Sequence, residues 1–516
     1  MASTVGAIDI GTNSLHLMVA QVRDDGSFRV VTREKEPVRL GSGPGDMKLL
    51  TDDAIDRGIE CLTRFRQIGE QWDAELLAMA TSAVREATNR DVFVDRALDE
   101  AGIEVEVISG TEEARLIHLG VLQAVPVGGR RHLVVDIGGG STEFIVGDGT
   151  RPLLLRSVKL GAIRLTDRFF PGGLVNERAV EACRLYVRGF LSSVVREIES
   201  LDPSMAIASS GTAETLAAMA GSAERLTASG LASVTDMILA EPTADDRRVN
   251  LGIEPRRSDI IAAGAILLSE ITKSIGVDDW EISELALRAG IIFDVSHRNR
   301  SDGGLHRLAD LRRQSVITVA ERFHEDIDHA EHITDLALEL FDAIADVHGL
   351  GEDDRDLLEA AGLLHNVGLY VAHSAHHKHS YYLIRHAEQL AGFTEHETEL
   401  IAQVARYHRK SGPKAKHTEW EALPTSDQSL VTWLAAILRV AIGLDRGDRT
   451  VVHRVEAEVS SETLQISARV RPAVNADLEI YSARSRAQLL SDVSGRKVTV
   501  SALADDALSR THPSDQ

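Results

Sequence analysis

Two stretches of the chain share one layout: "AIDIGTNSLHLMV", residues 7–19, and "VVDIGGGSTEFIV", residues 134–146. Each has an apolar strand that reaches an aspartate, a glycine turn that carries a hydroxyl, and a second apolar strand. The matching positions are Asp9 and Asp136, Gly11 and Gly138, Ser14 and Ser141, and Val19 and Val146. Two copies of one loop predict two related halves that face a common ligand.

The signals for strands and helices follow the same order around both stretches. Three strands within residues 5–36 precede alternating helices and strands, up to a helix that starts at Ser109. Three strands from "HLVVDI" onward precede a long helix after Asn176, a strand at "MAIAS" and a helix after Gly211. This repetition predicts an α/β protein with two duplicated lobes, at residues 1–125 and 126–300.

Strand patterns disappear after residue 300. Amphipathic helical periodicity continues from "VITVAERFHEDIDHAEHITDLALELF" to Leu444, and strand alternation returns in "VVHRVEAEVSSETLQISARV". The sequence therefore predicts an all-α domain at residues 301–449 and a small α+β domain at residues 450–516.

Composition and charge narrow the class of protein. The formal net charge of −23 repels polyanions, so a general nucleic-acid-binding surface is not expected. The two cysteines, Cys61 and Cys183, fit a reducing compartment, and the sequence shows no signal-peptide pattern and no long charge-free apolar run. We therefore expect a cytoplasmic protein with no membrane partner and no specific nucleic-acid partner.

The two glycine turns can cradle a phosphate group. No lysine follows the glycines as in a P-loop, but small residues let backbone N–H groups converge on an anion, and hydroxyls add donors. For either turn alone, a tight hairpin that needs glycine is an equally good interpretation; the pairing favours an anion site. The candidate phosphate-binding residues are Thr12, Asn13 and Ser14 in the first turn, and Gly138, Gly139, Gly140, Ser141 and Thr142 in the second.

Carboxylates flank the second turn. Asp136 and Glu143 lie seven residues apart across it, so both side chains can reach the turn region. Such oxygen ligands hold Mg²⁺, with water and substrate phosphate completing the coordination shell, although Asp136 has an alternative role in capping the turn amides. Asp9 occupies the matching position of the first turn and is a further candidate ligand. We expect Mg²⁺ or another divalent metal as cofactor.

A further carboxylate lies at a helix start in "VISGTEEARLIHLGV". Ser109 and Glu112 have the spacing of a capping box, which gives Glu112 a structural role. Glu113 also lies in the first helical turn, where the helix dipole favours an ionised carboxylate that can act as a general base. Glu113 is therefore a candidate catalytic residue.

Two other segments offer phosphate-binding groups. Arg85 enters a helix after a strand and suits bidentate phosphate binding, although an ion pair with Glu86 or Asp91 is the commoner role. Gly211 and Thr212 follow a strand and open a helix, which is either an anion site or an ordinary strand-to-helix loop.

Taken in chain order, seven motifs closely resemble the exopolyphosphatase and guanosine pentaphosphate phosphohydrolase (Ppx/GppA) family. They are "AIDIGTNSLHLMV", "ATSAVREATN", "ISGTEEARLIHLGV", "VVDIGGGSTEFIVG", "KLGAIRLTDRFF", "SSGTAETL" and "LALRAGII". The resemblance covers essentially the first 300 residues and implies two duplicated actin-like ATPase (ribonuclease H-like) lobes with a phosphate-chain site between them. It also implies that Glu113 is the catalytic glutamate, that Asp136 and Glu143 serve metal binding and catalysis, and that Arg85 contacts phosphate.

The resemblance implies an exopolyphosphatase, which hydrolyses the terminal phosphoanhydride of inorganic polyphosphate and releases orthophosphate. Glu113 would align and deprotonate a water molecule while Mg²⁺, the loop amides and Arg85 hold the terminal phosphoryl group. The nearest alternative is cleavage of the 5′ γ-phosphate of guanosine pentaphosphate. A nucleotide-gated actin-like binding protein is an alternative from another class.

The helical part resembles the third domain of longer family members, which is related to the HD phosphohydrolases. In a working HD site, His329, His365, the aspartate after it and Asp445 would hold a metal, but Asn366 stands at the aspartate position and is a poorer ligand. Hydrolysis by this domain, through His329, His365 and Asp445, is a third interpretation.

The helical part also carries basic residues in a segment without acidic ones, "RYHRKSGPKAKH", at residues 406–417. We interpret several of them, together with His377 and His379, as a polyanion track or an interdomain contact. The family resemblance makes a homodimer with a shared groove an expectation. The track residues are His377, His379, Arg406, His408, Arg409 and Lys410.

Overall fold

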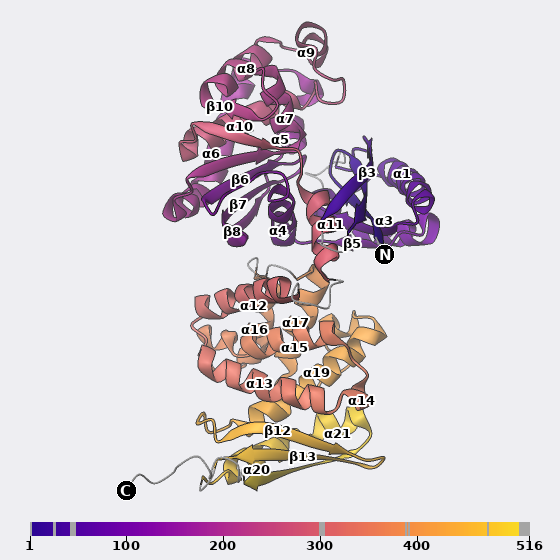
Figure 1. The fold of residues 1–516 in the computed structure, drawn as a ribbon, viewed down its shortest axis with the longest axis vertical. Helices are drawn as coiled ribbons and strands as arrows, with labels where there is room; N and C mark the ends of the chain where they lie inside the picture. The colour runs from indigo at the N-terminus through magenta and orange to yellow at the C-terminus, as the bar shows by residue number, and fades with distance from the viewer. Residues whose placement is uncertain are drawn as a thin grey trace. The chain divides into compact units, whose positions relative to one another are not determined.

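The computed structural model describes residues 3–23, 27–41, 48–298, 305–387, 390, 393–471 and 474–504. The chain divides into two compact units, Met1–Leu308 and Ala309–Gln516. The first unit is α/β and contains two lobes, and the second combines helices with a small sheet (Figure 1).

The first lobe is a five-stranded sheet in the order β3-β2-β1-β4-β5. β1 pairs antiparallel with β2 and parallel with β4, and the continuous apolar sequences of these strands fit a sheet that is covered on both faces. α1 begins after Thr51, whose side chain accepts a hydrogen bond from the Ala54 amide. The elements are β1 (Ser3–Ile10), β2 (Leu15–Val22), β3 (Phe28–Glu36), α1 (Asp52–Gln71), β4 (Glu75–Ala80), α2 (Ser82–Glu86), α3 (Arg90–Ala101), β5 (Val105–Val107) and α4 (Gly110–Val121).

The second lobe repeats this topology. Its sheet has the order β10-β11-β9-β6-β7-β8, so β6, β7, β8, β9 and β11 correspond to β1, β2, β3, β4 and β5. The predicted duplication is confirmed. The elements are β6 (Arg131–Ile137), β7 (Thr142–Asp148), β8 (Arg151–Val158), α5 (Ala162–Phe169), η1 (Pro171–Gly173), α6 (Glu177–Leu201), β9 (Met205–Ser209), α7 (Ser210–Met219), β10 (Arg225–Thr227), α8 (Ala228–Ala240), α9 (Ala244–Leu251), α10 (Ile261–Ile275), β11 (Asp279–Ser283) and α11 (Leu287–Arg298).

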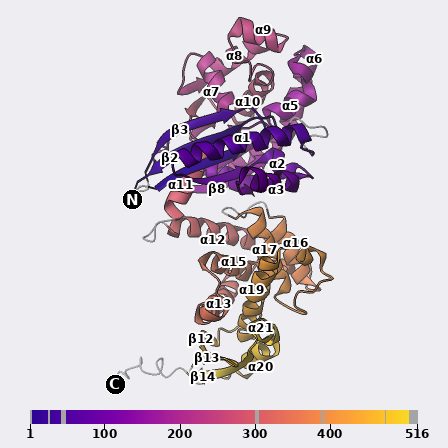
Figure 2. The ribbon, with the colours of Figure 1, turned by 90° about the vertical axis from the view of Figure 1, so that its right-hand side faces the viewer.

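Helices cover both faces of the first sheet. α1 and α3 pack on one face, and Figure 2 shows α1 lying across the strands. α11 packs against α4, β1 and β2, so a helix that the sequence places in the second lobe returns to the first. The hydrophobic cluster around this helix contains Met18 from the first lobe and Val134 and Ile145 from the second. The two lobes therefore share a core.

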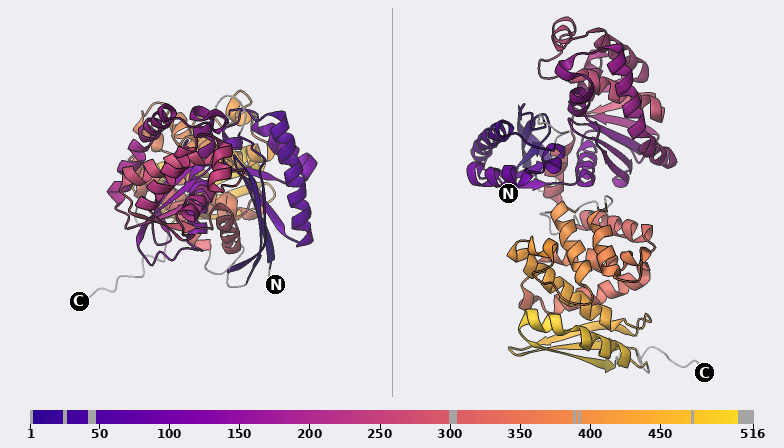
Figure 3. Two further views of the ribbon diagram at one scale, coloured as in Figure 1. Left: turned by 90° about the horizontal axis from the view of Figure 1, so that it is seen from above. Right: turned by 180° about the vertical axis from the view of Figure 1, so that it is seen from behind.

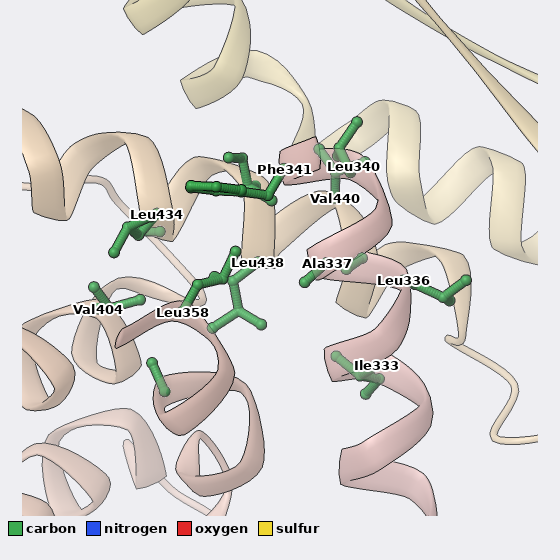
Figure 4. Packing of buried hydrophobic residues seen from close by; sticks show 14 of the residues in the cluster. Ile333, Leu336, Ala337, Leu340, Phe341, Leu358, Val404, Leu434, Leu438 and Val440 are labelled. Carbon is green, nitrogen blue, oxygen red and sulfur yellow. The ribbon is translucent and has the colours of Figure 1, made fainter. Parts of the chain in front are cut away.

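In the second unit, the predicted helices and the small sheet share one hydrophobic core. Figure 4 shows α13 residues such as Ile333 and Phe341 packed with Leu358, Leu434 and Leu438, and Figure 3 shows the sheet beside the helices. The elements are α12 (Leu305–Arg322), α13 (Ile327–Ala343), α14 (Ala345–His348), α15 (Glu352–Leu364), η2 (Val367–Tyr370), α16 (His376–Arg385), α17 (Glu395–Tyr407), α18 (Thr418–Glu421), α19 (Thr425–Leu444), β12 (Val452–Val459), β13 (Thr463–Val470), α20 (Asp477–Arg486), α21 (Gln488–Ser494) and β14 (Lys497–Ala504).

α19 is long and apolar enough to span a membrane by length and composition. Most of its apolar window is buried inside the protein, 61 % by residue, and it contributes Val431, Leu434 and Leu438 to the core of the second unit. A buried central helix of a globular domain has the same composition, so α19 carries no separate argument for a membrane.

Candidate active site

A cavity of about 570 Å³ lies between the two glycine turns in the first unit. Its walls come from both lobes: from the ends of β1, β2, β6 and β7, and from the first turns of α4, α7 and α11. The structure thus brings together most of the predicted site. The predicted residues that line the cavity are Asp9, Thr12, Asn13, Ser14, Glu113, Asp136, Gly138, Gly139, Gly140, Ser141, Glu143, Gly211 and Thr212.

The two glycine turns have the same internal geometry. The Gly11 amide donates to the Ser14 carbonyl at 3.2 Å, and the Gly138 amide donates to the Ser141 carbonyl at 2.9 Å. These bonds close each hairpin at equivalent positions. The repeat in the sequence is therefore a repeat in backbone conformation.

The carbonyl groups of both turns are bonded to neighbouring segments. In the first turn, the carbonyls of Thr12 and Asn13 accept hydrogen bonds from the amides of Gly41 and Arg39, at 3.0 and 2.9 Å. Among the described residues, the N–H groups of Thr12 and Asn13 donate to no intramolecular acceptor. Unbonded N–H groups lining a cavity form an anion-binding nest.

The second turn repeats this arrangement with α5. The Gly138 and Gly139 carbonyls accept from the Ala162 and Ile163 amides at 3.0 and 2.9 Å. In the part of the chain that the structure describes, the N–H groups of Gly139 and Gly140 also lack an intramolecular acceptor. Both turns therefore offer donors to the same cavity.

The two turns approach each other closely. A Cβ atom added at Gly139 would lie 3.0 Å from Cβ of Thr12, so the glycine turns of the two lobes lie against each other here. Ion pairs also join the lobes: Glu86 of the first binds Arg164 of the second at 2.8 Å, and Arg39 binds Asp259 at 2.9 Å. These contacts hold the two lobes together beside the cavity.

The start of α7 forms a further wall. Ser210 has a φ of +95°, a left-handed conformation that is strained for a residue with a side chain and is often found at functional sites. A Cβ atom added at Gly211 would lie 1.7 Å from a guanidinium nitrogen of Arg257. A larger residue at this position would therefore displace the guanidinium of Arg257.

Acidic residues flank both turns: Asp9 and Asp136 lie in equivalent places, and Glu143 lies where the first turn has His16. Asp136 pairs directly with Glu143 across β6 and β7, and Asp9 pairs with His16 across β1 and β2. The Asp136 carboxylate accepts a hydrogen bond from the Ser209 hydroxyl at 2.5 Å, and the Glu143 carboxylate accepts one from Ser157 at 2.8 Å.

Burial and mutual repulsion raise the pKa values of these acids. Burial, only partly offset by Arg288, raises the pKa of Asp9 to about 7. Burial likewise raises the pKa of Asp136 to about 6. Burial, together with repulsion from Glu113 and Asp136, holds the pKa of Glu143 well above its usual range. A bound cation would relieve this repulsion.

Glu113 lies in the first turn of α4 and is almost fully buried, with 7 % of its surface exposed. Arg85 donates to its carboxylate at 2.9 Å and to the Ile108 carbonyl at 3.0 Å. Burial raises the pKa of Glu113, while Arg85 opposes the rise. A carboxylate with a raised pKa that is held in one orientation suits a general base.

The Ser109 cap is confirmed, because its hydroxyl accepts a hydrogen bond from the Glu112 amide at 3.1 Å. The Glu112 carboxylate binds Arg115 at 2.6 Å, and Arg115 also binds Asp294 of α11 at 2.8 Å. Glu112 thus anchors α4 to α11 and leaves Glu113 at the cavity wall.

Two predicted phosphate-binding residues have other contacts. The Thr142 hydroxyl donates to the Leu160 carbonyl at 2.5 Å, because residue 142 already belongs to the buried strand β7. Arg85 does not line the cavity and instead holds Glu113. Both side chains are thus engaged within the protein, and the phosphate contacts expected of them stay predictions.

Four cations that the sequence analysis missed line the same cavity: Arg33 and Lys35 on β3, Arg257, and Arg288 on α11. Among the described residues, their side chains form no ion pair and no hydrogen bond. Arg33 and Lys35 are two residues apart on one strand, so their side chains point to the same face of the sheet. This spacing is the signal in the sequence that could have found them. Burial lowers the pKa of Arg288, and Asp9 opposes this shift.

His16 was also missed. It lies seven residues after Asp9, as Glu143 lies seven after Asp136, so the repeat itself indicates its position. Burial and the nearby Arg288 hold its pKa well below the usual range, and the imidazole is neutral.

The oxygen donors of the cavity fit a hard divalent cation such as Mg²⁺. Within the described part of the chain, Asp9, Asp136 and Glu143 do not form a set whose ligand atoms all lie within 4.8 Å of one another. Mg²⁺ is usually held by one or two carboxylates, with substrate phosphate and water as the remaining ligands. Asp136 and Glu143, paired across one ladder, are the best placed to hold it.

The second unit buries two histidines of the set predicted as a polyanion track or an interdomain contact. His408 is 2 % exposed and His377 is 7 % exposed, so neither presents its ring to solvent. Both lie where α16 and α17 pack together. Arg406 forms an ion pair with Glu419 at 3.1 Å, and Arg409 donates to His376 at 2.9 Å.

The two remaining track residues are His379, which is half-buried, and Lys410, which is exposed. The six residues do not form one exposed surface, because helix packing turns part of the set inward.

Raised pKa values in the cavity give an expected pH dependence. Asp9 and Asp136 have folded-state pKa values of about 7 and about 6, against an ordinary 3.8, so the unfolded chain loses their protons first. Without divalent metal, the free energy of unfolding should fall as the pH rises from 3.8 through these values. Mg²⁺ needs the ionised carboxylates, so its affinity should increase by about tenfold per pH unit for each proton displaced.

Thermal unfolding from about pH 5 to about pH 8, with and without Mg²⁺, measures this effect. The increase in melting temperature caused by Mg²⁺ is expected to grow with pH, and Asp136→Asn should reduce that growth. An increase of the same size across the range would contradict the metal assignment.

Comparison with known proteins finds a family match for each of the two units. Residues 18–299 match the family model described as Ppx/GppA phosphatase family, and residues 311–482 match Ppx/GppA phosphatase, domain III. A guanosine-5′-triphosphate,3′-diphosphate pyrophosphatase of Pseudoalteromonas atlantica is 30 % identical over 78 % of this chain and 79 % of its own. One of Vibrio parahaemolyticus is 29 % identical over 93 % and 95 %.

Solved structures of similar proteins have the fold of the first unit. An exopolyphosphatase from Cytophaga hutchinsonii is 30 % identical, covers 58 % of this chain and 99 % of its own, and superposes with a TM-score of 0.54. A family member from Aquifex aeolicus is 27 % identical over 58 % and 100 %, with a TM-score of 0.51. The predicted duplicated actin-like fold is confirmed by these structures and by the repeated sheets.

Proposed function

Because the chain belongs to the Ppx/GppA phosphatase family, we propose that its first unit hydrolyses the terminal phosphoanhydride of inorganic polyphosphate and releases orthophosphate. The observation that carries the proposal is the composition of the cavity. Amides of both turns and four cations, which have no hydrogen bond or ion pair among the described residues, converge with the buried Glu113 on one space of about 570 Å³.

Positioning and charge neutralisation supply the catalysis. The amides of Thr12, Asn13, Gly139 and Gly140 bind the terminal phosphoryl oxygens, and a divalent metal would neutralise part of the phosphate charge when bound. Glu113 takes a proton from a water molecule. The water oxygen forms a bond to the terminal phosphorus, and the bridging P–O bond breaks with its electrons on the shortened chain.

Arg85 acts through Glu113 rather than on phosphate. Its guanidinium links the Glu113 carboxylate to the Ile108 carbonyl, so the base points in one direction during attack. Arg288 and Arg257, which line the cavity without ion pairs among the described residues, neutralise the phosphate chain in place of Arg85. Guanidinium groups suit this role because they bind phosphate oxygens in a bidentate manner.

The cavity lining favours polyphosphate over a guanine nucleotide. Among the described residues, no phenylalanine, tyrosine or tryptophan lines the cavity, so a base has no aromatic ring of that kind to stack on. The second candidate is hydrolysis of guanosine pentaphosphate, which the names of the full-length relatives favour. Both substrates present a terminal phosphoanhydride to the same residues.

Initial rates of orthophosphate release from long-chain polyphosphate and from guanosine pentaphosphate, measured side by side with Mg²⁺, test the proposal. We expect the higher kcat/KM for polyphosphate. Rapid release from guanosine pentaphosphate with negligible release from polyphosphate would reverse the ranking. Release from neither would support the nucleotide-gated binding protein.

The exposed cations of β3 give a prediction about substrate binding. Arg33→Ala and Lys35→Ala are each expected to raise KM for long-chain polyphosphate by about threefold to tenfold at low salt, with little change in kcat, because each removes one partly screened charge contact. Steady-state kinetics at two ionic strengths measure this. Arg29→Ala is the matched control, since Arg29 is exposed on the same strand and does not line the cavity. An equal KM for all three variants would contradict a phosphate path along β3.

We further propose that the protein is a cytoplasmic homodimer, as the family resemblance suggests. Light scattering coupled to size-exclusion chromatography measures the mass directly. A monomer at micromolar concentration would exclude the dimer as the working form.

A further inference from the structure

Two histidines of the first unit are buried side by side outside the catalytic cavity. His118 lies on α4 and is 1 % exposed, and His132 lies on β6 and is 0 % exposed. Their Nε2 atoms are 2.9 Å apart, and their rings stack with centroids 5.2 Å apart. A hydrogen bond therefore joins a helix of the first lobe to a strand of the second.

The tautomers of the two rings follow from their partners. Nδ1 of His132 lies 3.0 Å from the Arg130 carbonyl, which can only accept, so this nitrogen carries a proton. Nε2 of the neutral His132 ring then has a lone pair, and Nε2–H of His118 donates to it. A single proton between the two nitrogens holds the contact.

The strand opposite His132 closes this contact to solvent. Gly147 pairs with His132 across β6 and β7, and a Cβ atom added there would lie 2.5 Å from Nε2 of His118 and 2.7 Å from Nε2 of His132. A second proton would set two N–H groups against each other in a buried place. The hydrogen bond would then break, because neither group could find another acceptor there without movement of the backbone.

Burial opposes protonation of both rings. It lowers the pKa of His118 to about 3, and the neighbouring His132 adds to this shift. Burial also lowers the pKa of His132, while the Arg130 carbonyl and the Asp148 carboxylate oppose the shift and the Arg130 guanidinium adds to it. The neutral, hydrogen-bonded pair is therefore the form present at neutral pH.

Other described charged side chains on the elements around the pair are directed elsewhere. Arg115 of α4 binds Glu112 and Asp294, at 2.6 and 2.8 Å. Arg156 of β8 pairs with Glu197 of α6 at 2.9 Å. The remaining ones are exposed at strand starts or line the catalytic cavity: Glu113, Arg131, Asp136, Glu143, Arg151 and Arg288.

Helix α4 connects the pair to the proposed general base. Glu113 precedes His118 by five residues, or about 7.5 Å along the helix axis. Arg115 ties α4 to α11, and the histidine pair ties it to β6; Figure 1 shows α4 beside β8 of the second lobe. A shift of α4 would therefore move Glu113 relative to the phosphate-binding turns.

We propose that His118 and His132 are positioning residues for the Glu113 base, and that their one-proton hydrogen bond is an anchor of α4 that acid weakens. The inference rests on the proposed function, because it takes Glu113 as the base. Neither histidine touches the substrate, so both act through the placement of α4.

Substitutions of His118 test the positioning role at about pH 8. His118→Leu leaves Nε2 of His132 without a donor, and kcat for orthophosphate release should fall by about tenfold to a hundredfold with KM nearly unchanged. His118→Gln carries an amide that can replace the Nε2–H donor, so it should keep most of the wild-type kcat. His118→Asn, whose amide is too short to reach His132, should lose kcat as leucine does and serves where leucine disturbs packing.

Ser269→Ala is the matched control. It removes a buried hydrogen bond of 2.9 Å to Thr235 in the second lobe, away from α4. It should lower the free energy of unfolding and leave kcat unchanged. Wild-type kcat in His118→Leu and His118→Asn, or an equal loss of kcat in Ser269→Ala, would overturn the positioning role.

Urea unfolding against pH tests the one-proton bond without any assay of activity. Both folded-state pKa values lie below the ordinary 6.5, so the unfolded chain binds protons first and stability is lost as the pH falls below 6.5. In His118→Gln the amide can turn and accept from a protonated His132. The folding equilibrium constant of the wild type should therefore fall relative to that of His118→Gln by up to about tenfold per pH unit, while contributions of Asp9 and Asp136 cancel.

A ratio of the two equilibrium constants that does not change with pH would overturn the one-proton bond. A wild type that releases no phosphate would overturn the proposed function and with it the positioning role. The unfolding comparison would still decide the histidine bond in that case.

Discussion

Glu113→Gln is expected to lower kcat for orthophosphate release by about 10²-fold to 10⁴-fold, the usual effect of removing a general base, and to leave KM near its wild-type value. The amide oxygen of glutamine can still accept the hydrogen bond from Arg85, so the side chain keeps its orientation. The variant loses only the ability to take a proton from water. Steady-state phosphate release under multiple turnover measures the effect.

Glu177→Gln is the matched control for this variant. Glu177 lies in the first turn of α6, as Glu113 does in α4, but it is exposed and outside the cavity. It should keep wild-type kinetics. If folded Glu113→Gln releases phosphate at the wild-type rate, Glu113 is not the base.

Gly161→Ala is expected to lower kcat/KM by about 10²-fold or more, because a misplacement of about 1 Å in a positioning group costs this much. The added Cβ atom would lie 2.3 Å from the Gly139 carbonyl oxygen and 2.5 Å from the Gly140 nitrogen. Both are backbone atoms of the second glycine turn, so the turn must shift. The N–H groups that we propose to bind phosphate would move with it.

The effect of Gly161→Ala is steric rather than conformational. Gly161 has φ −146° and ψ 159°, an extended conformation that alanine adopts freely. Gly189→Ala is the control, because Gly189 lies inside α6 with nothing within 4 Å of an added Cβ atom, and alanine there should stabilise the helix by up to about 1 kcal/mol. Kinetics and thermal unfolding of both variants separate a displaced turn from a general loss of fold. A wild-type kcat/KM in Gly161→Ala would contradict the anion role of the turn.

The sequence was informative where short-range pattern determines structure. The repeated spacing from Asp9 to Val19 and from Asp136 to Val146 predicts two hairpins, and the structure has them with equivalent hydrogen bonds. The strand and helix order predicts both lobes for the same reason, because alternation and capping are local properties.

The sequence was less informative where distant segments meet. Nearly the whole sequence of the first unit separates Arg288 from Asp9. Only the return of α11 to β1 and β2 brings Arg288 to the cavity. Thr142 was assigned to the turn because composition does not show where the turn ends and β7 begins, and its hydroxyl donates to the Leu160 carbonyl. The burial of His408 could not be predicted, because a basic stretch of sequence becomes partly buried only when α16 packs on α17.

The central claim is that water, activated in the cleft of the first unit, attacks the terminal phosphorus of a phosphoanhydride chain. Hydrolysis of polyphosphate by the full-length protein in H₂¹⁸O, followed by mass spectrometry of the products, tests it directly. We expect one ¹⁸O atom in each released orthophosphate and none in the shortened chain. Unlabelled orthophosphate with label at the new chain end, or no orthophosphate at all, would contradict the claim.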